Sequence, residues 1–417
     1  MPADVPAPAQ VPAPDGVGIV WDDALCEYDF GPYHPMAPIR LTLTRILAGA
    51  AGVLDRECVR TLPAPVASDE ELQAVHDPAL VQAVRRSSPG FEGLTAKDLD
   101  ELISFGIGGD DVPPFPGMHT ASARIAGGSL AAVDAIIAGH VRSAVNVAGG
   151  MHHAKPGSVS GFCVYNDAAL AVRRALDAGE ERVMYVDVDV HHGDGVQAIF
   201  YDDPRVLTVS LHESGRTLFP GTGWPADTGG PGAEGTAVNI ALPPGVTDGP
   251  WLRALASVAA PVVRAFEPQV LISQHGCDTH REDPLAHMAI SLDAQRQAAV
   301  NLHRLAHEVA DGRWVAVGGG GYDVTSAVPR SWTHLTAIAA HRPLPATTET
   351  PQEWRDHVQL VSGQPGAERM GELPDRDLPI WVQPWAMGYN PHHGVDRAIM
   401  ATRQAVFPFH GLDVWYD

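Results

Sequence analysis

VDVDVHHGDG, residues 186–195, alternates valine with Asp187, Asp189 and His191. This alternation predicts a β-strand that carries three polar side chains on one face. A buried strand of an α/β protein is usually apolar throughout, so charge here is costly unless a cation compensates it. The Gly-Asp-Gly turn at 193–195 places the cluster at the carboxyl end of its strand, where open α/β sheets bind ligands. We therefore predict a metal site at this position.

Strands and helices alternate along most of the chain. Apolar runs predict strands at 17–21, 144–148, 183–190, 206–212, 236–241, 270–274 and 314–317. Amphipathic spacing predicts helices at 39–51, 68–84, 118–139, 167–178, 249–266, 294–309 and 331–341. The alternation predicts an α/β fold with a central parallel sheet and helices on both faces.

The two ends of the chain differ from this central part. Residues 1–16 are rich in proline and alanine and are predicted to be a disordered arm. Residues 17–342 contain the alternating strands and helices and are predicted to be a single domain. Residues 343–417 carry four of the nine tryptophans, which is too many for a disordered tail. We expect them to be an ordered extension packed on the core.

The composition narrows the classes of partner. A net charge of −22 argues against nucleic acid or an anionic membrane as the main partner. The four cysteines form no CxxC pair, so reduced thiols in a cytoplasmic protein are expected. The sequence shows neither a signal-like start nor an apolar run of membrane-spanning length. The oligomeric state is left open.

Polar clusters follow four of the predicted strands, at 149–153, 187–194, 275–278 and 318–322. The carboxyl ends of parallel strands meet at one edge of a sheet, so the four clusters should converge. Two carboxylates and one imidazole would leave coordination positions open, as a catalytic metal site requires. The tandem histidines 152 and 153 could act as acid and base if carboxylates orient them. Tyr322 could donate a hydrogen bond to an oxyanion.

Each of these motifs alone has a more ordinary explanation. Alternating aspartates are more often an exposed strand face, and tandem histidines are usually a satisfied polar pair. The glycine run 318–321 could cradle a phosphate, but no GK[ST] follows it. The functional interpretation depends on the joint occurrence of the motifs at one predicted sheet edge.

Six motifs in this order carry a resemblance to a known family: GGMHHA, GFCVYND, YVDVDVHHGDG, SLHESGRTLFPGTG, QHGCDTHREDPLAH and GGGGYDV. Together they resemble the zinc-dependent histone deacetylase superfamily, and are most similar to the bacterial acetoin-utilisation deacetylases, over residues 17–340. The resemblance implies an arginase/deacetylase-like fold with one zinc or ferrous ion and a structural potassium ion. It also implies removal of acetyl or short acyl groups from protein lysines by a metal-bound water.

The resemblance implies a role for each matching catalytic residue. The implied metal ligands are Asp189, His191 and Asp278. His153, paired with Asp194, falls on the general base and acid. His152, paired with Asp187, falls on the histidine that supplies electrostatic stabilisation. Tyr322 falls on the tyrosine that polarises the acyl carbonyl.

The resemblance also implies substrate and ion contacts. The implied substrate-binding residues are Phe162, Phe219, Gly161, Gly320, Leu285 and Asp111, with the two phenylalanines as tunnel walls. Asp111 matches a rim aspartate that holds the substrate backbone, although Asp110 leaves this alignment open by one residue. Arg40 matches the arginine of an acetate-exit channel. The implied potassium ligands are Asp187, Asp189, His191, Ser210 and Leu211.

Several alternatives stay open at this point. An acetylpolyamine amidohydrolase would use the same metal centre, but Leu285 stands where polyamine-specific relatives are expected to carry a glutamate. His275 stands where eukaryotic members commonly have cysteine. A two-manganese ureohydrolase and a binding module without catalysis are further alternatives. The implied partners are acyl-lysine proteins, with acetyl-CoA synthetase as one target.

Overall fold

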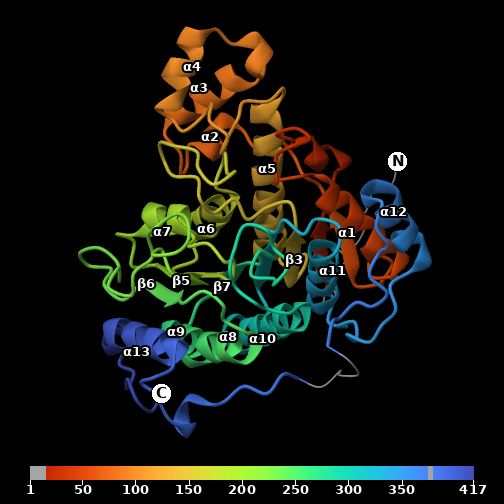
Figure 1. Cartoon of the computed structure of the whole chain (residues 1–417). Coiled ribbons are helices and arrows are strands. Elements are labelled where there is room, and N and C mark those ends of the chain that lie inside the picture. The colour runs from red at the N-terminus through yellow and green to blue at the C-terminus, as the bar shows by residue number, and fades with distance from the viewer. Residues whose placement is uncertain (1–15, 374–378) are drawn as a thin grey trace, which may run out of the picture.

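The computed structural model describes residues 16–373 and 379–417 and contains one parallel eight-stranded sheet (Figure 1). Its strands run in the order β2-β1-β3-β8-β7-β4-β5-β6. Their bounds are β1 Val17–Val20, β2 Val59–Leu62, β3 Ser143–Asn146, β4 Val183–Asp187, β5 Val206–Glu213, β6 Ala237–Leu242, β7 Val270–Gln274 and β8 Trp314–Val317. The strands that precede the four polar clusters, β3, β8, β7 and β4, are consecutive neighbours. The clusters therefore do meet at one edge.

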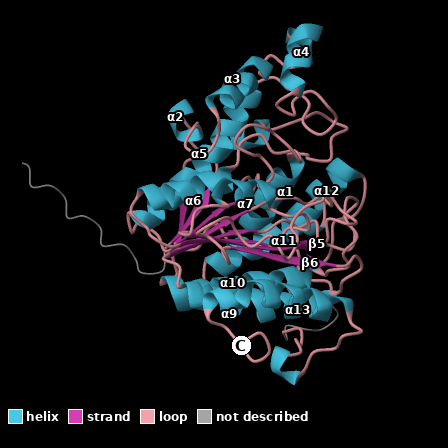
Figure 2. Cartoon of the chain, turned by 90° about the vertical axis from the view of Figure 1, so that its left-hand side faces the viewer, coloured by secondary structure: helices cyan, strands magenta, loops and turns pink. Residues whose placement is uncertain are grey.

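Helices cover both faces of this sheet, as predicted (Figure 2). α5 (Met118–Ile137) and α6 (Asp167–Asp177) lie on one face, and α9 (Ala260–Phe266), α10 (Leu292–Ala310) and α13 (Gly394–Val406) lie on the other. β3, β4, β7 and β8 are buried along their whole length, since helices cover both of their sides. The predicted α/β class, with a central parallel sheet and helices on both faces, is confirmed.

Some predicted boundaries are wrong. The strand predicted at 183–190 ends at Asp187, because the carboxylates of Asp187 and Asp189 accept hydrogen bonds from the amides two residues ahead and turn the chain. The helix predicted at 68–84 is two helices, α2 (Asp69–Leu72) and α3 (Pro78–Ser87), because proline begins a new helix at its first position.

Other elements complete the chain. A π-helical turn at Leu255–Ala259 divides the helix predicted at 249–266 into α8 (Asp248–Ala254) and α9. α4 (Ala96–Ile103) was not predicted, and it lies with α2 and α3 in a lobe beyond the sheet (Figure 1). The remaining helices are α1 Ile39–Ala50, α7 Asp194–Phe200, α11 Ala327–Ala339 and α12 Gln352–Ser362. None of the helices in the described ranges is long and apolar enough to cross a membrane.

Where it is described, at 343–373 and 379–417, the C-terminal segment includes α12 and α13 and packs on the core. Trp354 of α12 is fully buried in a cluster with α1 residues. Trp385 is buried with the guanidinium groups of Arg253 and Arg403 at 5.1 and 4.8 Å from its ring centroid. The arm predicted at 1–16 lies, except for its last residue, outside the described residues.

Candidate functional site

The three predicted metal ligands come together beyond the ends of β4 and β7. Nδ1 of His191 lies 3.1 Å from an oxygen of Asp189 and 3.2 Å from an oxygen of Asp278. The ligand atoms of all three residues lie within 4.8 Å of one another. Both carboxylates are fully buried and the histidine is nearly so.

The charges at this cluster fit a divalent cation. Burial, and then the charge of Asp189, raise the pKa of Asp278. Burial would lower the pKa of His191, but hydrogen bonds to the two carboxylates raise it to about 10. The cluster therefore attracts positive charge, and two oxygens with one nitrogen form a donor set that zinc or iron accepts. Gly320 is required beside it, since a Cβ there would lie 1.9 Å from Oδ2 of Asp278.

The tandem histidines each pair with a buried carboxylate. Nδ1 of His152 lies 2.7 Å from Oδ2 of Asp187, and Nδ1 of His153 lies 2.7 Å from Oδ1 of Asp194. The two Nε2 atoms are 3.0 Å apart. Because each Nδ1–H donates to its carboxylate, the two Nε2 atoms face each other within hydrogen-bond distance.

The two histidines differ in protonation. Burial would lower the pKa of His152, but the charges of Asp187 and Asp189 outweigh it and raise this pKa to about 9. Burial, and then the charge of His152, lower the pKa of His153 to about 3 against the opposing effect of Asp194. At neutral pH the pair therefore holds one cation and one neutral base.

Aromatic rings line the approach to these groups. The Phe219 ring is 45% exposed and meets the His153 ring edge-on at 5.1 Å between centroids. The Phe162 ring meets the Tyr322 ring at 5.7 Å. A Cβ at Gly161 would lie 2.3 Å from Cδ2 of His153, so only glycine allows this close approach. The structure thus brings both predicted tunnel walls to the catalytic groups.

Asp111 is exposed and holds one of these walls in place. Its Oδ2 accepts a hydrogen bond from the Gly161 amide at 2.9 Å, and its Oδ1 accepts one from the Phe162 amide at 3.3 Å. Phe162 has a φ of 64°, an uncommon conformation that needs such support. Asp110 makes no such side-chain hydrogen bond in the described part of the chain. These two hydrogen bonds therefore favour Asp111 over Asp110 as the predicted rim aspartate.

Arg40 is buried and lies close enough to Tyr322 to interact with it electrostatically. Its Nη1 donates to the carbonyl oxygens of Gly319 at 2.9 Å and Gly321 at 3.3 Å, and its guanidinium lies 5.0 Å from the centroid of the Trp332 ring. Burial lowers its pKa. Among the described residues it forms no ion pair with a carboxylate. Its charge is therefore available to a small anion, as an acetate channel would need.

The predicted potassium ligands come from neighbouring strands. Ser210 and Leu211 lie on β5, and Ser210 pairs in register with Asp187 of β4. The Ser210 hydroxyl lies 2.8 Å from Nδ1 of His212. A potassium ion at these residues stays a prediction.

Two further residues support the histidine pairs and were not predicted. The Tyr185 hydroxyl donates to Oδ2 of Asp187 at 2.7 Å, and Nζ of Lys155 lies 2.9 Å from Oδ2 of Asp194. Strand alternation places Tyr185 on the same face as Asp187, which was a usable signal. Lys155 follows the second histidine by two residues, but nothing in that spacing indicates a contact.

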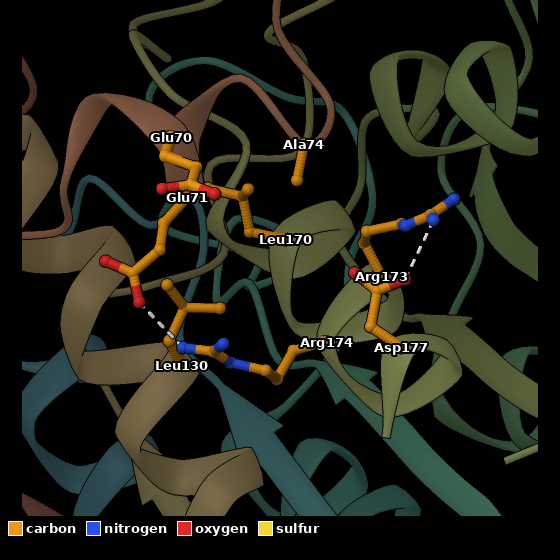
Figure 3. Close-up of a pocket in the computed structure, with 8 residues that line it drawn as sticks. All are labelled: Glu70, Glu71, Ala74, Leu130, Leu170, Arg173, Arg174 and Asp177. Atoms are coloured by element: carbon orange, nitrogen blue, oxygen red, sulfur yellow. Dashed lines mark hydrogen bonds and ion pairs between the residues drawn. The ribbon is translucent and has the colours of Figure 1, made fainter. Parts of the chain in front are cut away.

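A separate surface pocket contains none of the predicted site residues (Figure 3). It is lined by Glu70, Glu71, Ala74, Leu130, Leu170, Arg173, Arg174 and Asp177. Four of its five charged residues form ion pairs with one another, Glu71 with Arg174 and Arg173 with Asp177, each at 2.7 Å. The pocket is separate from the polar clusters at the sheet edge.

Comparison with known proteins identifies the family of the part of the chain that holds this site. The histone deacetylase domain matches residues 34–339, which cover every predicted site residue. The chain belongs to the histone deacetylase family. The matched range contains seven of the eight strands, β2 to β8, and β1 precedes residue 34.

Individual members of the histone deacetylase family cover more of the chain. An acetoin utilization protein AcuC of Bacillus subtilis is 41% identical over 308 residues, 74% of this chain and 78% of its own. A protein of the same name from Staphylococcus xylosus is 35% identical over 337 residues, 81% of this chain and 86% of its own. One from Staphylococcus aureus strain MSSA476 is 35% identical over 88% of this chain and 96% of its own.

Proposed function

We propose that the protein is a divalent-metal-dependent deacetylase that removes acetyl or short acyl groups from lysine side chains of proteins. The observation that carries the proposal is the pair of facing histidines, with Nε2 atoms 3.0 Å apart, beside the cluster of Asp189, His191 and Asp278. An acid, a base and a cation site at one point meet the needs of amide hydrolysis.

Each group has a separate task. A zinc or ferrous ion held by the Asp189–His191–Asp278 cluster would act as the Lewis acid that polarises the amide carbonyl and acidifies a water. His153, neutral at pH 7, takes the proton of the attacking water at Nε2 and gives it to the leaving amine. His152, a cation at that pH, stabilises the negative charge that develops. The Tyr322 hydroxyl donates a hydrogen bond to the carbonyl oxygen.

The walls of the site favour a slender, neutral chain such as an acyl-lysine side chain. Phe162 and Phe219 are apolar, and Leu285, 36% exposed in the loop after β7, offers no charge to a secondary ammonium. A polyamine substrate would leave that ammonium without a partner, which is costly in a partly buried position. We therefore favour acyl-lysine proteins, acetyl-CoA synthetase among them, over acetylpolyamines.

Hydrolysis rates on acetyl-lysine peptides and on acetylputrescine test this choice. The expected result is a higher kcat/KM on the peptides than on acetylputrescine. A chelator should abolish the activity, and added Zn²⁺ or Fe²⁺ should restore it. A clear preference for acetylputrescine would overturn the substrate assignment. Activity that survives complete metal removal would overturn the metal-dependent mechanism.

Replacement of Asp111 by alanine is expected to raise KM about tenfold with a smaller effect on kcat, which corresponds to about 1.4 kcal/mol of binding. The variant loses both hydrogen bonds to the Gly161–Phe162 segment, so the tunnel wall and the rim are no longer held for the substrate. Steady-state kinetics on an acetyl-lysine peptide measure the change. Asp110→Ala is the matched control and should keep the parent KM, and an equal effect in both variants would contradict the role of Asp111.

A further inference from the structure

A cluster of three histidines lies away from the catalytic edge. His303 and His307 are one helical turn apart on α10, and His341 follows the end of α11. Nε2 of His303 lies 3.1 Å from Nδ1 of His341 and 3.2 Å from Nε2 of His307. The ligand atoms of the three residues lie within 4.8 Å of one another. Among the residues that the structure describes, no carboxylate belongs to this group of ligand atoms.

The cluster stands at the opposite end of β8 from the catalytic groups. The His303 ring lies 5.4 Å from the ring of Trp314, the first residue of β8. Tyr322 comes after the last residue of the same strand. A metal bound by the three histidines would therefore be separate from the one at the catalytic cluster.

Hydrogen bonds alone do not satisfy Nε2 of His303 well. A neutral imidazole carries one N–H and one lone pair, so Nε2 of His303 is either a donor or an acceptor. As a donor it has one hydrogen for two neighbours, and as an acceptor it has one lone pair for two donors. A cation that accepts one lone pair from each ring satisfies all three nitrogens at once.

The distances fit such a cation. Nitrogens at about 2.0–2.1 Å from a tetrahedral zinc ion are about 3.3–3.4 Å apart. The two observed contacts, 3.1 and 3.2 Å, are close to this value.

The backbone also positions these rings. His341 has a φ of 54° just after α11, where glycine is the usual residue because other side chains are strained there. Gly312 lies against the cluster, since a Cβ at that position would be 2.7 Å from Cε1 of His307. The chain thus accepts an unfavourable backbone conformation at His341 and leaves room for the ring of His307.

We propose that His303, His307 and His341 form a second metal site, which binds a late first-row transition ion such as Zn²⁺ and clamps the end of α10 to the segment after α11. Three imidazoles without a carboxylate select such ions over Mg²⁺ or Ca²⁺. The exposed side of His307 leaves the fourth position to water. The site has a structural role and takes no part in hydrolysis.

Zinc content tests the site directly. The full chain without an affinity tag is stripped with a chelator, equilibrated with Zn²⁺ and analysed for bound zinc per chain. His307→Ala, a change at an exposed side chain, is expected to bind one zinc ion fewer than the parent and to keep the parent deacetylase activity. His140→Ala, at an exposed histidine outside the cluster, should bind as much as the parent. Equal zinc content in the parent and His307→Ala would overturn the proposal.

His341→Gly gives a second, independent readout. Glycine adopts the positive φ without strain, so in chelator this variant should melt at or above the temperature of the parent. Added Zn²⁺ should raise the melting temperature of the parent more than that of the variant, because only the parent keeps the third ligand. An equal rise in both proteins would contradict a metal clamp. Both tests measure a difference between parent and variant, so they hold whether or not the catalytic site binds its ion.

Discussion

Replacement of His153 by alanine is expected to lower kcat on an acetyl-lysine peptide by about 10²–10⁴-fold, the usual contribution of a general base. Asp194 fixes the imidazole through Nδ1 and leaves Nε2 with a lone pair. The pKa of about 3 keeps this nitrogen unprotonated at pH 7, so His153 is already in the form that can accept a proton. Alanine leaves no group to take the proton of water or return it to the amine.

Comparison with a second histidine variant separates the roles. His152→Ala should lower kcat less than His153→Ala, since His152 contributes charge rather than proton transfer. Bound metal, measured per chain, should stay at the parent value in both, because neither residue belongs to the Asp189–His191–Asp278 cluster. His357→Ala, on the surface helix α12, is the matched control and should keep full activity. A larger loss in His152→Ala than in His153→Ala would reverse the assignment.

The pattern of the sequence predicted the sheet better than the details of its edge. Strands β7 and β8 matched their predicted ranges 270–274 and 314–317, because a proline or glycine lies within two residues of each end of both runs. The predicted strand 183–190 continued too far, because Asp187 and Asp189 bond backbone amides of the next turn. The alternation of apolar and polar residues carries no information about such hydrogen bonds between side chains and the backbone.

At the site, too, residues in short local motifs were predicted, and contacts between residues distant in the chain were not. The Asp189–His191 spacing is visible in the sequence, and a polar cluster after a second strand indicated Asp278. Asp283 was not predicted, yet its Oδ2 accepts a hydrogen bond from the Tyr322 amide at 2.8 Å. The two residues are distant along the chain and come from different loops, so only the folded structure brings them together.

Tyr322→Phe is expected to lower kcat by about 10²–10³-fold, or about 2.7–4 kcal/mol, with KM little changed. Phenylalanine keeps the ring that meets Phe162 and the amide bonded to Asp283, so only the hydroxyl is lost. Burial, and then Asp278 and Asp189, raise the pKa of this hydroxyl well above its usual range. It therefore stays protonated and can donate to the carbonyl oxygen as negative charge develops.

Steady-state kinetics and affinity for an uncleaved acyl-lysine peptide analogue together test this role. The variant should bind the analogue nearly as well as the parent, because the hydroxyl bond strengthens mainly in the transition state. Tyr416→Phe removes a hydroxyl from a side chain that is 86% exposed and should leave both values unchanged. If Tyr322→Phe kept kcat within a factor of three of the parent, the carbonyl would have to be polarised without this phenol. The proposed role of the Tyr322 hydroxyl beside the metal cluster would then be wrong.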